Sequence, residues 1–276
     1  EIHQAAPFDV LLPCLDGELP RFIALRKEIE ALGVSLLLPE QEAFDRRAKL
    51  SLFNPETAPQ CEGIEIPESV IAWSLEDLQY AWQRFGAPLA VKGPLYGCVR
   101  INSEQDIASA WKKFQGWGVY SVIAQPWIDG DVFAVAAVCD ENHQTIASLT
   151  VEKLASCHRG STWSAQFVEH PELESSFADL LEMMDWVGPA EGEFIYNAKA
   201  DKYYLFEINP RFTGWISYSD ALGSNHPLLA VQAAMGKKTK PASNTTHLIF
   251  MRSSSSIELK PTALASLTLK GTIQNG

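Results

Sequence analysis

The chain has 276 residues, of which 46% are hydrophobic, so it is long enough to bury a large core as one big domain or two lobes. Its formal net charge of −12 and the lack of any Lys/Arg-rich stretch argue against nucleic acid and favour a small partner. The longest apolar runs are far too short to cross a bilayer, and no secretory signal is recognisable. Five widely spaced cysteines without a Cys-x-x-Cys pair are typical of thiols in a reducing cytoplasm, where we expect the protein: residues 14, 61, 98, 139 and 157.

The N-terminal part predicts a strand, a helix and a second strand in a βαβ-like order. Residues 8–12 are apolar and favour a strand, and residues 34–38 favour a second one. Between them, residues 18–33 have the periodicity of an amphipathic helix that ends at Gly33. This opening is typical of an open α/β domain.

Two Ser-capped helices are predicted to flank a short strand at residues 88–93. The first helix, residues 74–86, has Ser74 as N-cap and Asp77 at the capping-box position. The second begins at Ser103 and extends to residue 118 in the same pattern.

The second half predicts a run of strands interrupted by one helix. Residues 172–188 form the helix, and two of the strands are joined by the polar turn at 199–201. The tail after Gly236 is rich in Lys, Ser and Thr and is assigned no structure. The predicted strands cover residues 119–128, 132–139, 144–153, 192–198 and 202–209.

The predicted hairpin of strands 192–198 and 202–209 carries an unusual set of side chains. Strand alternation places Tyr203, Leu205, Glu207 and Asn209 on one face, and pairing through the turn would set Glu193 opposite Glu207. Facing carboxylates repel each other, and a hard divalent cation with oxygen ligands would hold them together. Asn209 would supply a third oxygen, and Mg²⁺ would imply nucleotide phosphates nearby. The alternative is a solvated hairpin end with two surface glutamates.

The stretch EINPRFTG, followed by HPLLAVQAAMG at 226–236, which is predicted to be helical, resembles the ATP-grasp superfamily. The resemblance is strongest to the branch of carbamoyl-phosphate synthase large chains and carboxylate–amine ligases. It implies an α/β fold with two lobes that hold ATP between them. The implied parts are a remnant of an open α/β domain at 1–40, most of which is missing, a small ATP-grasp lobe at 41–120, and a C-terminal lobe at 121–276.

The resemblance also assigns roles at the end of the hairpin. Glu193, Glu207 and Asn209 fall on the metal-binding positions, which implies Mg²⁺ between the ATP phosphates, with Mn²⁺ as an alternative. Arg211 falls where the family stabilises the transferred phosphate or the acyl phosphate, and it is therefore a candidate catalytic residue.

Two lysines match the family positions that hold the α- and β-phosphates. Lys92 ends the short strand at 88–93, and a protective charge on an edge strand is its alternative explanation. Lys49 stands beside Arg46 and Arg47, so a helix-face charge explains it equally well. We expect both lysines to contact phosphate, and Lys92 to take part in catalysis.

The segment Gln125, Pro126, Trp127 and Ile128 resembles the family hinge that presents main-chain groups to the adenine edge. Pro and Trp suit a stiff apolar slot for a flat base. The family's ribose-binding Glu is replaced here by Val132, so Asp131 would have to substitute for it.

Two further features bear on catalysis. The stretch GPLYGCVRI offers only Gly93 and Gly97 in a short turn, where many relatives have a long Gly-rich phosphate loop. The stretch 156–166 resembles a region that in related ligases faces the acceptor or the reacting acyl phosphate. His158 and the candidate catalytic Arg159 could bind a carboxylate or phosphate there, and a polar surface loop is the alternative.

The implied reaction is activation of a small carboxylate by ATP to an acyl phosphate, which an amine or similar nucleophile then attacks. Two other classes stay open. A nucleotide-binding module without catalysis is favoured by the short phosphate turn and by Val132. A phosphotransferase would use the same lobes to pass phosphate to a hydroxyl acceptor.

Overall fold

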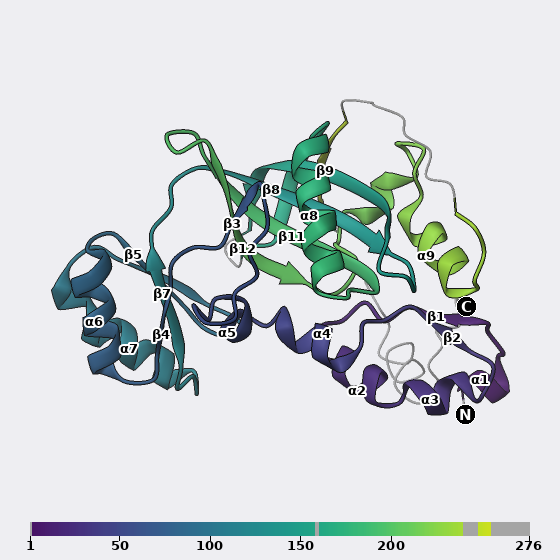
Figure 1. Ribbon diagram of the computed structural model, residues 1–276, viewed down its shortest axis with the longest axis horizontal. Helices are drawn as coiled ribbons and strands as arrows, with labels where there is room; N and C mark the ends of the chain where they lie inside the picture. Colours follow the sequence, from purple (N-terminus) through teal and green to yellow (C-terminus); the bar gives the residue numbers. More distant parts are fainter. Residues whose placement is uncertain (1, 158–159, 240–247, 255–276) are drawn as a thin grey trace, which may run out of the picture.

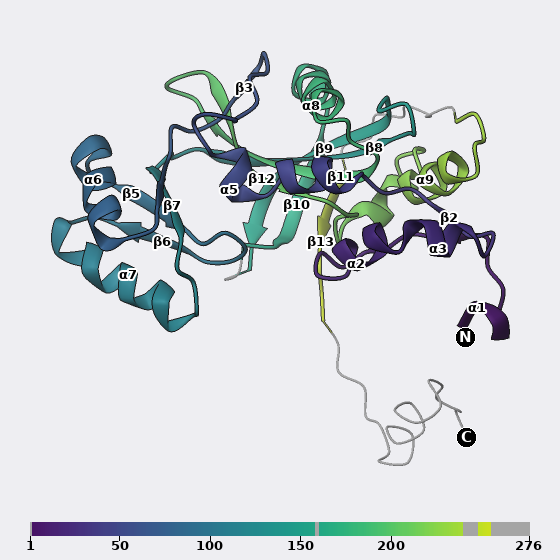
Figure 2. The same cartoon turned by 60° about the horizontal axis from the view of Figure 1, so that its bottom comes forward.

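In the computed structural model, the small lobe lies at one end of the long axis, and the large lobe extends towards the other end with the N-terminal segment beside it (Figure 1). The structure describes residues 2–157, 160–239 and 248–254. Within these residues the strands form sheets of two, four and seven strands. Figure 2 shows the four-stranded sheet and its helices at one end of the molecule and the N-terminal helices at the other.

The N-terminal segment has the predicted βαβ-like order. β1 (Val10–Leu11) pairs in parallel with β2 (Ser35–Leu36), which confirms the two strands but shortens both. The expected helix at 18–33 is two helices, α2 (Leu19–Ala24) and α3 (Arg26–Glu30), because the backbone leaves helical geometry at Leu25. The remaining helices of this part are α1 (Ile2–Ala5), α4 (Gln41–Arg46) and α5 (Lys49–Leu52).

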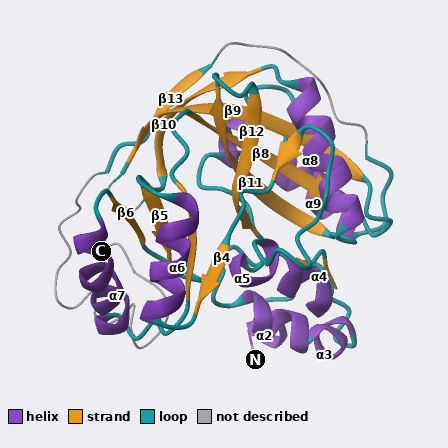
Figure 3. Ribbon diagram, turned by 60° about the vertical axis from the view of Figure 1, so that its left-hand side comes forward, coloured by secondary structure: helices purple, strands orange, loops and turns teal. Residues whose placement is uncertain are grey.

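The four-stranded sheet and two helices form the small lobe. Its antiparallel strands are ordered β4 (Val70–Ala72), β7 (Val122–Pro126), β5 (Leu89–Lys92) and β6 (Cys98–Ile101). The helices α6 (Leu75–Phe85) and α7 (Ile107–Gly116) pack on it around an apolar core that includes Leu78 and Phe114 (Figure 3).

The caps of the two helices differ from each other. Ser74 and Asp77 form the predicted reciprocal capping box of α6, with Asp77 N donating to Ser74 Oγ at 3.1 Å. Ser103 does not cap α7, because the 3₁₀ turn η1 (Glu104–Asp106) intervenes. The hydroxyl of Ser103 donates instead to the Asp106 carboxylate at 2.7 Å.

The seven-stranded sheet forms most of the large lobe. Its order is β13 (Ile249–Met251), β10 (Thr162–Val168), β9 (Thr145–Ser156), β8 (Asp131–Cys139), β11 (Gly188–Asn197), β12 (Lys202–Asn209) and β3 (Ile64–Glu65). All neighbouring strands in it are antiparallel except β12 and β3. The other elements are α8 (Pro171–Met183), the 3₁₀ turn η2 (Ile216–Ser219) and α9 (His226–Ala234).

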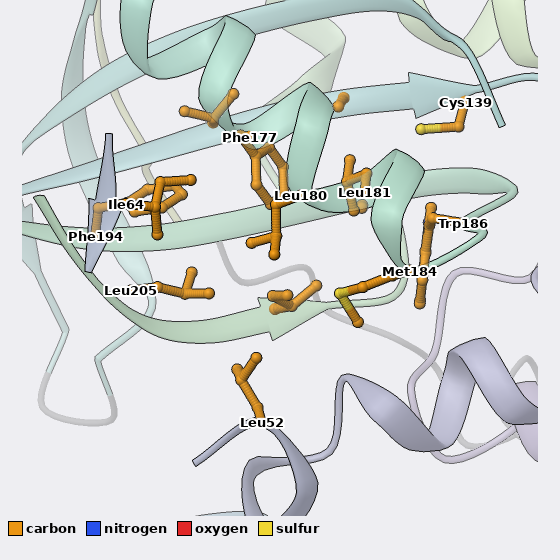
Figure 4. Packing of buried hydrophobic residues seen from close by; sticks show 14 of the residues in the cluster. Leu52, Ile64, Cys139, Phe177, Leu180, Leu181, Met184, Trp186, Phe194 and Leu205 are labelled. Atoms are coloured by element: carbon orange, nitrogen blue, oxygen red, sulfur yellow. The ribbon is translucent and has the colours of Figure 1, made fainter. Parts of the chain in front are cut away.

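The main core of the large lobe lies between α8 and the sheet. Phe177, Leu180 and Leu181 of α8 are fully buried against Phe194 and Leu205 of the hairpin (Figure 4). Fully burying one such side chain contributes about 1.5–3 kcal/mol. This packing holds the β11–β12 hairpin from one face and leaves its other face for the polar side chains described below.

β10 occupies part of the stretch 156–166, for which a polar surface loop was one of the two alternatives. Ser164, Ala165 and Phe167 are buried there, and the strand pairs with both β9 and β13. The strand is hard to recognise in the sequence because some of its buried positions carry polar residues. Ser164 is buried there because its hydroxyl donates a hydrogen bond to Phe250 O at 2.8 Å.

None of the helices in the described part of the chain is long and apolar enough to cross a membrane. Cys14, Cys61, Cys98 and Cys139 are thiols rather than disulfide halves. The location in the cytoplasm stays a prediction.

Candidate active site

The β11–β12 hairpin places Glu193 directly opposite Glu207, as the sequence predicted. The polar turn at 199–201 is also present, and Asn197 Oδ1 accepts hydrogen bonds from Lys199 N at 3.1 Å and Ala200 N at 2.9 Å. One face assignment is wrong. Leu205 lies in the core opposite Phe194 rather than beside Glu207, because a β-bulge breaks the alternation between Glu193 and Phe194.

A third carboxylate completes the group, and we call Glu191, Glu193 and Glu207 the carboxylate cluster. Glu191 is 3% exposed and lies opposite Asn209, whose Nδ2 donates to Glu191 at 3.2 Å and to Glu193 at 3.3 Å. Trp215 Nε1 also donates to Glu191, at 3.1 Å. Glu191 therefore fixes the amide and the indole that border the cluster.

Cationic side chains neutralise this cluster. Lys153 of β9, itself 3% exposed, forms an ion pair with Glu193. Lys49 Nζ lies 2.9 Å from Glu207 Oε1. Burial raises the pKa of Glu193 to about 7, Lys153 opposes the rise, and the Glu191 and Glu207 carboxylates add to it. Glu193 and Glu207 are thus each paired with a lysine.

Arg211 follows β12 and joins the cluster to the N-terminal segment. Its Nη1 lies 3.3 Å from Glu191 Oε2, and its Nε lies 3.1 Å from Asp16 Oδ1. The guanidinium is held between two carboxylates that come from distant parts of the chain. This fixed orientation suits a residue that stabilises charge beside Glu193 and Asn209.

The two lysines chosen from the sequence lie on the same side of the hairpin. Lys92 Nζ, at the end of β5, is 5.5 Å from the ring centre of Phe53 and 5.4 Å from that of Phe206. Burial is the main cause that lowers the pKa of Lys92 to about 8, and the neighbouring Lys49 charge acts in the same direction. Lys49 Nζ also donates to Leu95 O at 3.4 Å. The structure therefore brings both lysines beside Glu207.

The segment predicted to border adenine connects the two lobes. The side chain of Gln125 is buried and donates to Ser69 Oγ at 2.8 Å, so only its main chain could face a base. Pro126 ends β7, and Trp127 N donates to Pro88 O at 3.0 Å. Ile128 follows and is half-buried. The Arg100 guanidinium covers the Trp127 ring at 4.7 Å, so the slot is more polar than predicted.

One further candidate, Asp131, lies at the turn end of the hairpin. Asp131 is the exposed first residue of β8 and pairs in register with Tyr196, at the turn end of the hairpin. Arg159 and His158 lie outside the described residues. Their roles, like those of the other candidate site residues, stay predictions.

Sequence reasoning missed three charged side chains at this site. Glu191 could have been found, since it stands two positions before Glu193 on the same strand. Lys153 ends a predicted strand and gave only a weak signal. Arg252, which follows β13 and lines a cavity beside the cluster, gave none.

Comparison with known proteins identifies the fold. The ATP-grasp domain family matches residues 85–215, which include the small-lobe sheet from β5 onwards and the whole β11–β12 hairpin. Residues 85–215 therefore resemble an ATP-grasp domain. The family match and the structural neighbours confirm the predicted resemblance and the α/β fold.

The curated relatives of this chain are distant. The carbamoyl phosphate synthase large chain of Rubrobacter xylanophilus is 24% identical over 235 residues, which cover 78% of this chain and 22% of that protein. D-alanine–D-alanine ligase of Pseudomonas entomophila is 32% identical over 83 residues, 29% of this chain and 26% of that protein. The chain thus spans about a quarter or less of the length of these curated relatives.

Among solved structures, a biotin carboxylase β,γ-ATP complex from Campylobacter jejuni has a fold similar to that of this chain. The TM-score is 0.74 at 14% identity, over 90% of this chain and 59% of that one. The match extends well beyond residues 85–215. The lobe boundaries near residues 40 and 120 stay a prediction, although β7 continues the small sheet to Pro126.

Proposed function

We propose that this chain is an ATP-dependent ligase that activates a carboxylate as an acyl phosphate and transfers the acyl group to an amine. The observation that carries the proposal is the direct opposition of Glu193 and Glu207, with Asn209 and Arg211 following on the same strand end. Facing carboxylates destabilise a hairpin unless cations hold them. The similarity to carbamoyl phosphate synthase large chains and to D-alanine–D-alanine ligase supports the ligase class.

The donor set fits Mg²⁺. Glu193 and Glu207 offer hard carboxylate oxygens, and the ion pairs of both with lysine ammonium groups support cation binding at these positions. Asn209 donates hydrogen bonds through Nδ2, and rotation of its side-chain amide would present Oδ1 to a metal ion instead. When bound, Mg²⁺ would neutralise phosphate charge, and Mn²⁺ accepts the same oxygen ligands. Within the described residues, no three His, Cys, Asp or Glu side chains form a metal site by themselves.

The chain's own residues would act on the phosphates and the acyl group. Lys49 and Lys92 would hold ATP phosphates, since both reach the Glu207 end of the hairpin from other elements. The carboxylate of the substrate would attack the terminal phosphorus, and ADP would leave. Arg211, fixed by Glu191 and Asp16, would stabilise the charge that develops on the transferred group. Residues 125–128 would border the adenine.

The first test is nucleotide-dependent stabilisation. We would measure the thermal unfolding midpoint with and without millimolar Mg·ATP for the wild type, Glu207→Gln and the control Glu65→Gln. Glu65 is a carboxylate on the same sheet that pairs with Lys202 at 2.5 Å, away from the cluster. A ligand at about a hundred times its dissociation constant adds roughly 2.7 kcal/mol.

We expect a shift of several degrees in the wild type and in Glu65→Gln, and none in Glu207→Gln. Phosphate release on addition of a carboxylate and an amine, with a new amide in the products, would then establish the ligase. Equal shifts in all three proteins would contradict the metal assignment. A phosphorylated acceptor without an amide would identify a phosphotransferase.

One observation favours a second candidate, an ATP-binding module without catalysis. The turn that joins β5 to β6 is closed by a hydrogen bond from Gly93 N to Gly97 O at 2.9 Å, and a Cβ on Gly93 would lie 2.3 Å from Tyr96 O. The Gly93 amide is thus committed within the turn and does not cradle phosphate. A Mg·ATP shift without phosphate release for any substrate pair would support this module.

A further inference from the structure

A cavity of about 560 Å³ lies beside the carboxylate cluster. Glu191, Glu193 and Arg211 form one wall, Trp215 and Ile216 contribute apolar surface, and Arg252 forms another wall. The volume is in the range of small-molecule sites. The cavity opens next to the groups that would perform the phosphoryl chemistry, so a reacting substrate can reach them from it.

Arg252 is held in place by neighbours from two other elements. Its backbone N donates to Trp163 O at 2.8 Å, at the end of the β10–β13 pairing. Its guanidinium lies 5.9 Å from the ring centre of Trp163. A methyl group on Gly214 would lie only 3.3 Å from Arg252 Nη1. The guanidinium therefore lies close to both the indole and the Gly214 backbone.

Within residues 2–157, 160–239 and 248–254, Arg252 has no acidic partner, unlike the other charged groups of the cavity. Glu193 is paired with Lys153, and Glu191 is paired with Arg211, which also contacts Asp16. Among the residues that the structure describes, no carboxylate lies within ion-pair distance of Arg252. A fixed, exposed guanidinium fork on a cavity wall suits a planar carboxylate that comes from outside the chain.

We propose that the cavity takes an α-amino acid as the acceptor amine and that Arg252 binds its carboxylate. The inference rests on the proposed ligase function and adds the class of acceptor. The amine would then face Arg211 and Glu193, and the side chain would contact Trp215 and Ile216. The amine nitrogen forms a bond to the acyl carbon, the carbon–oxygen bond to phosphate breaks with its electron pair, and a proton passes to water.

The test compares amino acids with their carboxamides, which keep the amine and the side chain but lose the negative charge. Phosphate release would be measured with a panel of protein amino acids and the matching amides, in the presence of Mg·ATP and a panel of small carboxylates. The proteins are the wild type, Arg252→Gln, Arg252→Lys and the control Arg84→Gln. Arg84 is an exposed arginine of the small lobe that pairs with Glu68.

We expect the wild type and Arg84→Gln to prefer the acid over the amide by roughly 10- to 100-fold in kcat/KM, the range of one charged hydrogen-bonded contact. Arg252→Gln should lose this preference because kcat/KM falls for the acid and stays unchanged for the amide. Arg252→Lys should keep part of the preference. Equal losses for acid and amide in Arg252→Gln, or an unchanged preference, would overturn the proposal.

Two binding measurements separate this inference from the ligase proposal. A normal Mg·ATP thermal shift in Arg252→Gln shows that the nucleotide site is intact in the variant. Calorimetric titration of the same amino acids into nucleotide-free wild type and Arg252→Gln tests the carboxylate contact without turnover. If no amino acid of the panel binds to the wild type or is consumed by it, the inference about the acceptor is wrong. The Mg·ATP shift of the wild type tests the ligase proposal separately.

Discussion

In the small lobe the buried side chains between the sheet and its helices are apolar, whereas the end of the β11–β12 hairpin buries Glu191, Glu193 and Asn209. The first region has an apolar core, an amphipathic helix and a capping box at Ser74, as local rules of folding predict. The second collects like charges that cost free energy unless partners neutralise them. Regions that break such rules are expected where a protein performs its function.

The ion pair between Lys153 and Glu193 offers the strongest test of this contrast. Glu193→Leu should cost about 3–5 kcal/mol in the free energy of unfolding, because it leaves the buried Lys153 without a carboxylate. Lys153→Met should cost less, because burial raises the pKa of Glu193 to about 7 and the carboxylate can take up a proton. Urea unfolding of both single variants and of the double variant provides the measurement.

The double variant Lys153→Met/Glu193→Leu should recover most of the loss, since apolar side chains can replace a buried ion pair at little cost. If the double variant loses as much free energy of unfolding as the two single variants together, the two side chains act independently. The ion pair then does not explain the destabilisation, and this position does not support the contrast between the two regions.

His226 allows the effect of burying a polar side chain to be measured away from the candidate active site, because it is buried outside the carboxylate cluster. Its two ring nitrogens have no hydrogen-bond partner among the described residues. Burial lowers its pKa from 6.5 to about 4, so the unfolded chain binds a proton that the folded chain does not. Stability should therefore fall by about 3 kcal/mol as pH falls from 6.5 to 4.

The check is the urea midpoint at a series of pH values for the wild type and His226→Leu. Their difference should change across this pH window and stay constant above pH 6.5. Parallel curves down to pH 4 would show that another group carries the acid sensitivity.

Lys92 joins the two regions, since it ends a small-lobe strand and covers Phe206 of the hairpin. Burial lowers its pKa from 10.5 to about 8, so the charged form destabilises the free protein at neutral pH. Lys92→Met should add about 1–3 kcal/mol there, and the gain should shrink as pH rises from 8 towards 10.5. The same variant should lose the Mg·ATP shift, so nucleotide-free and nucleotide-bound unfolding midpoints must be measured side by side.

The smallest effect is expected in the small lobe. Ser74→Ala should cost about 1 kcal/mol, because Asp77 N loses its acceptor at the start of α6. Ser103→Ala serves as the matched control, since Ser103 accepts no such bond at its 3₁₀ turn and should cost clearly less. Thermal unfolding of the two variants, with Mg·ATP binding unchanged in both, is the measurement.

Local pattern was sufficient for several parts of this protein. The α6 capping box, the helix at 226–234 and the β11–β12 hairpin follow from residues a few positions apart, and so does the opposition of Glu193 and Glu207. Cap spacing and strand alternation depend on backbone geometry that any chain shares, so one sequence reveals them. The motif that follows the hairpin also pointed to the ATP-grasp fold, which the family match confirms.

Only the tertiary structure decided which charges meet. Lys153 reaches Glu193 from another strand, Asp16 reaches Arg211 from the N-terminal segment, and Arg252 enters the cavity from a strand at the sheet edge. The bulge beside Glu193 also places Leu205 in the core, whereas strict strand alternation would have placed it on the same face as Glu207. Contacts between distant segments depend on how the sheet orders its strands, and neither periodicity nor composition encodes that order locally.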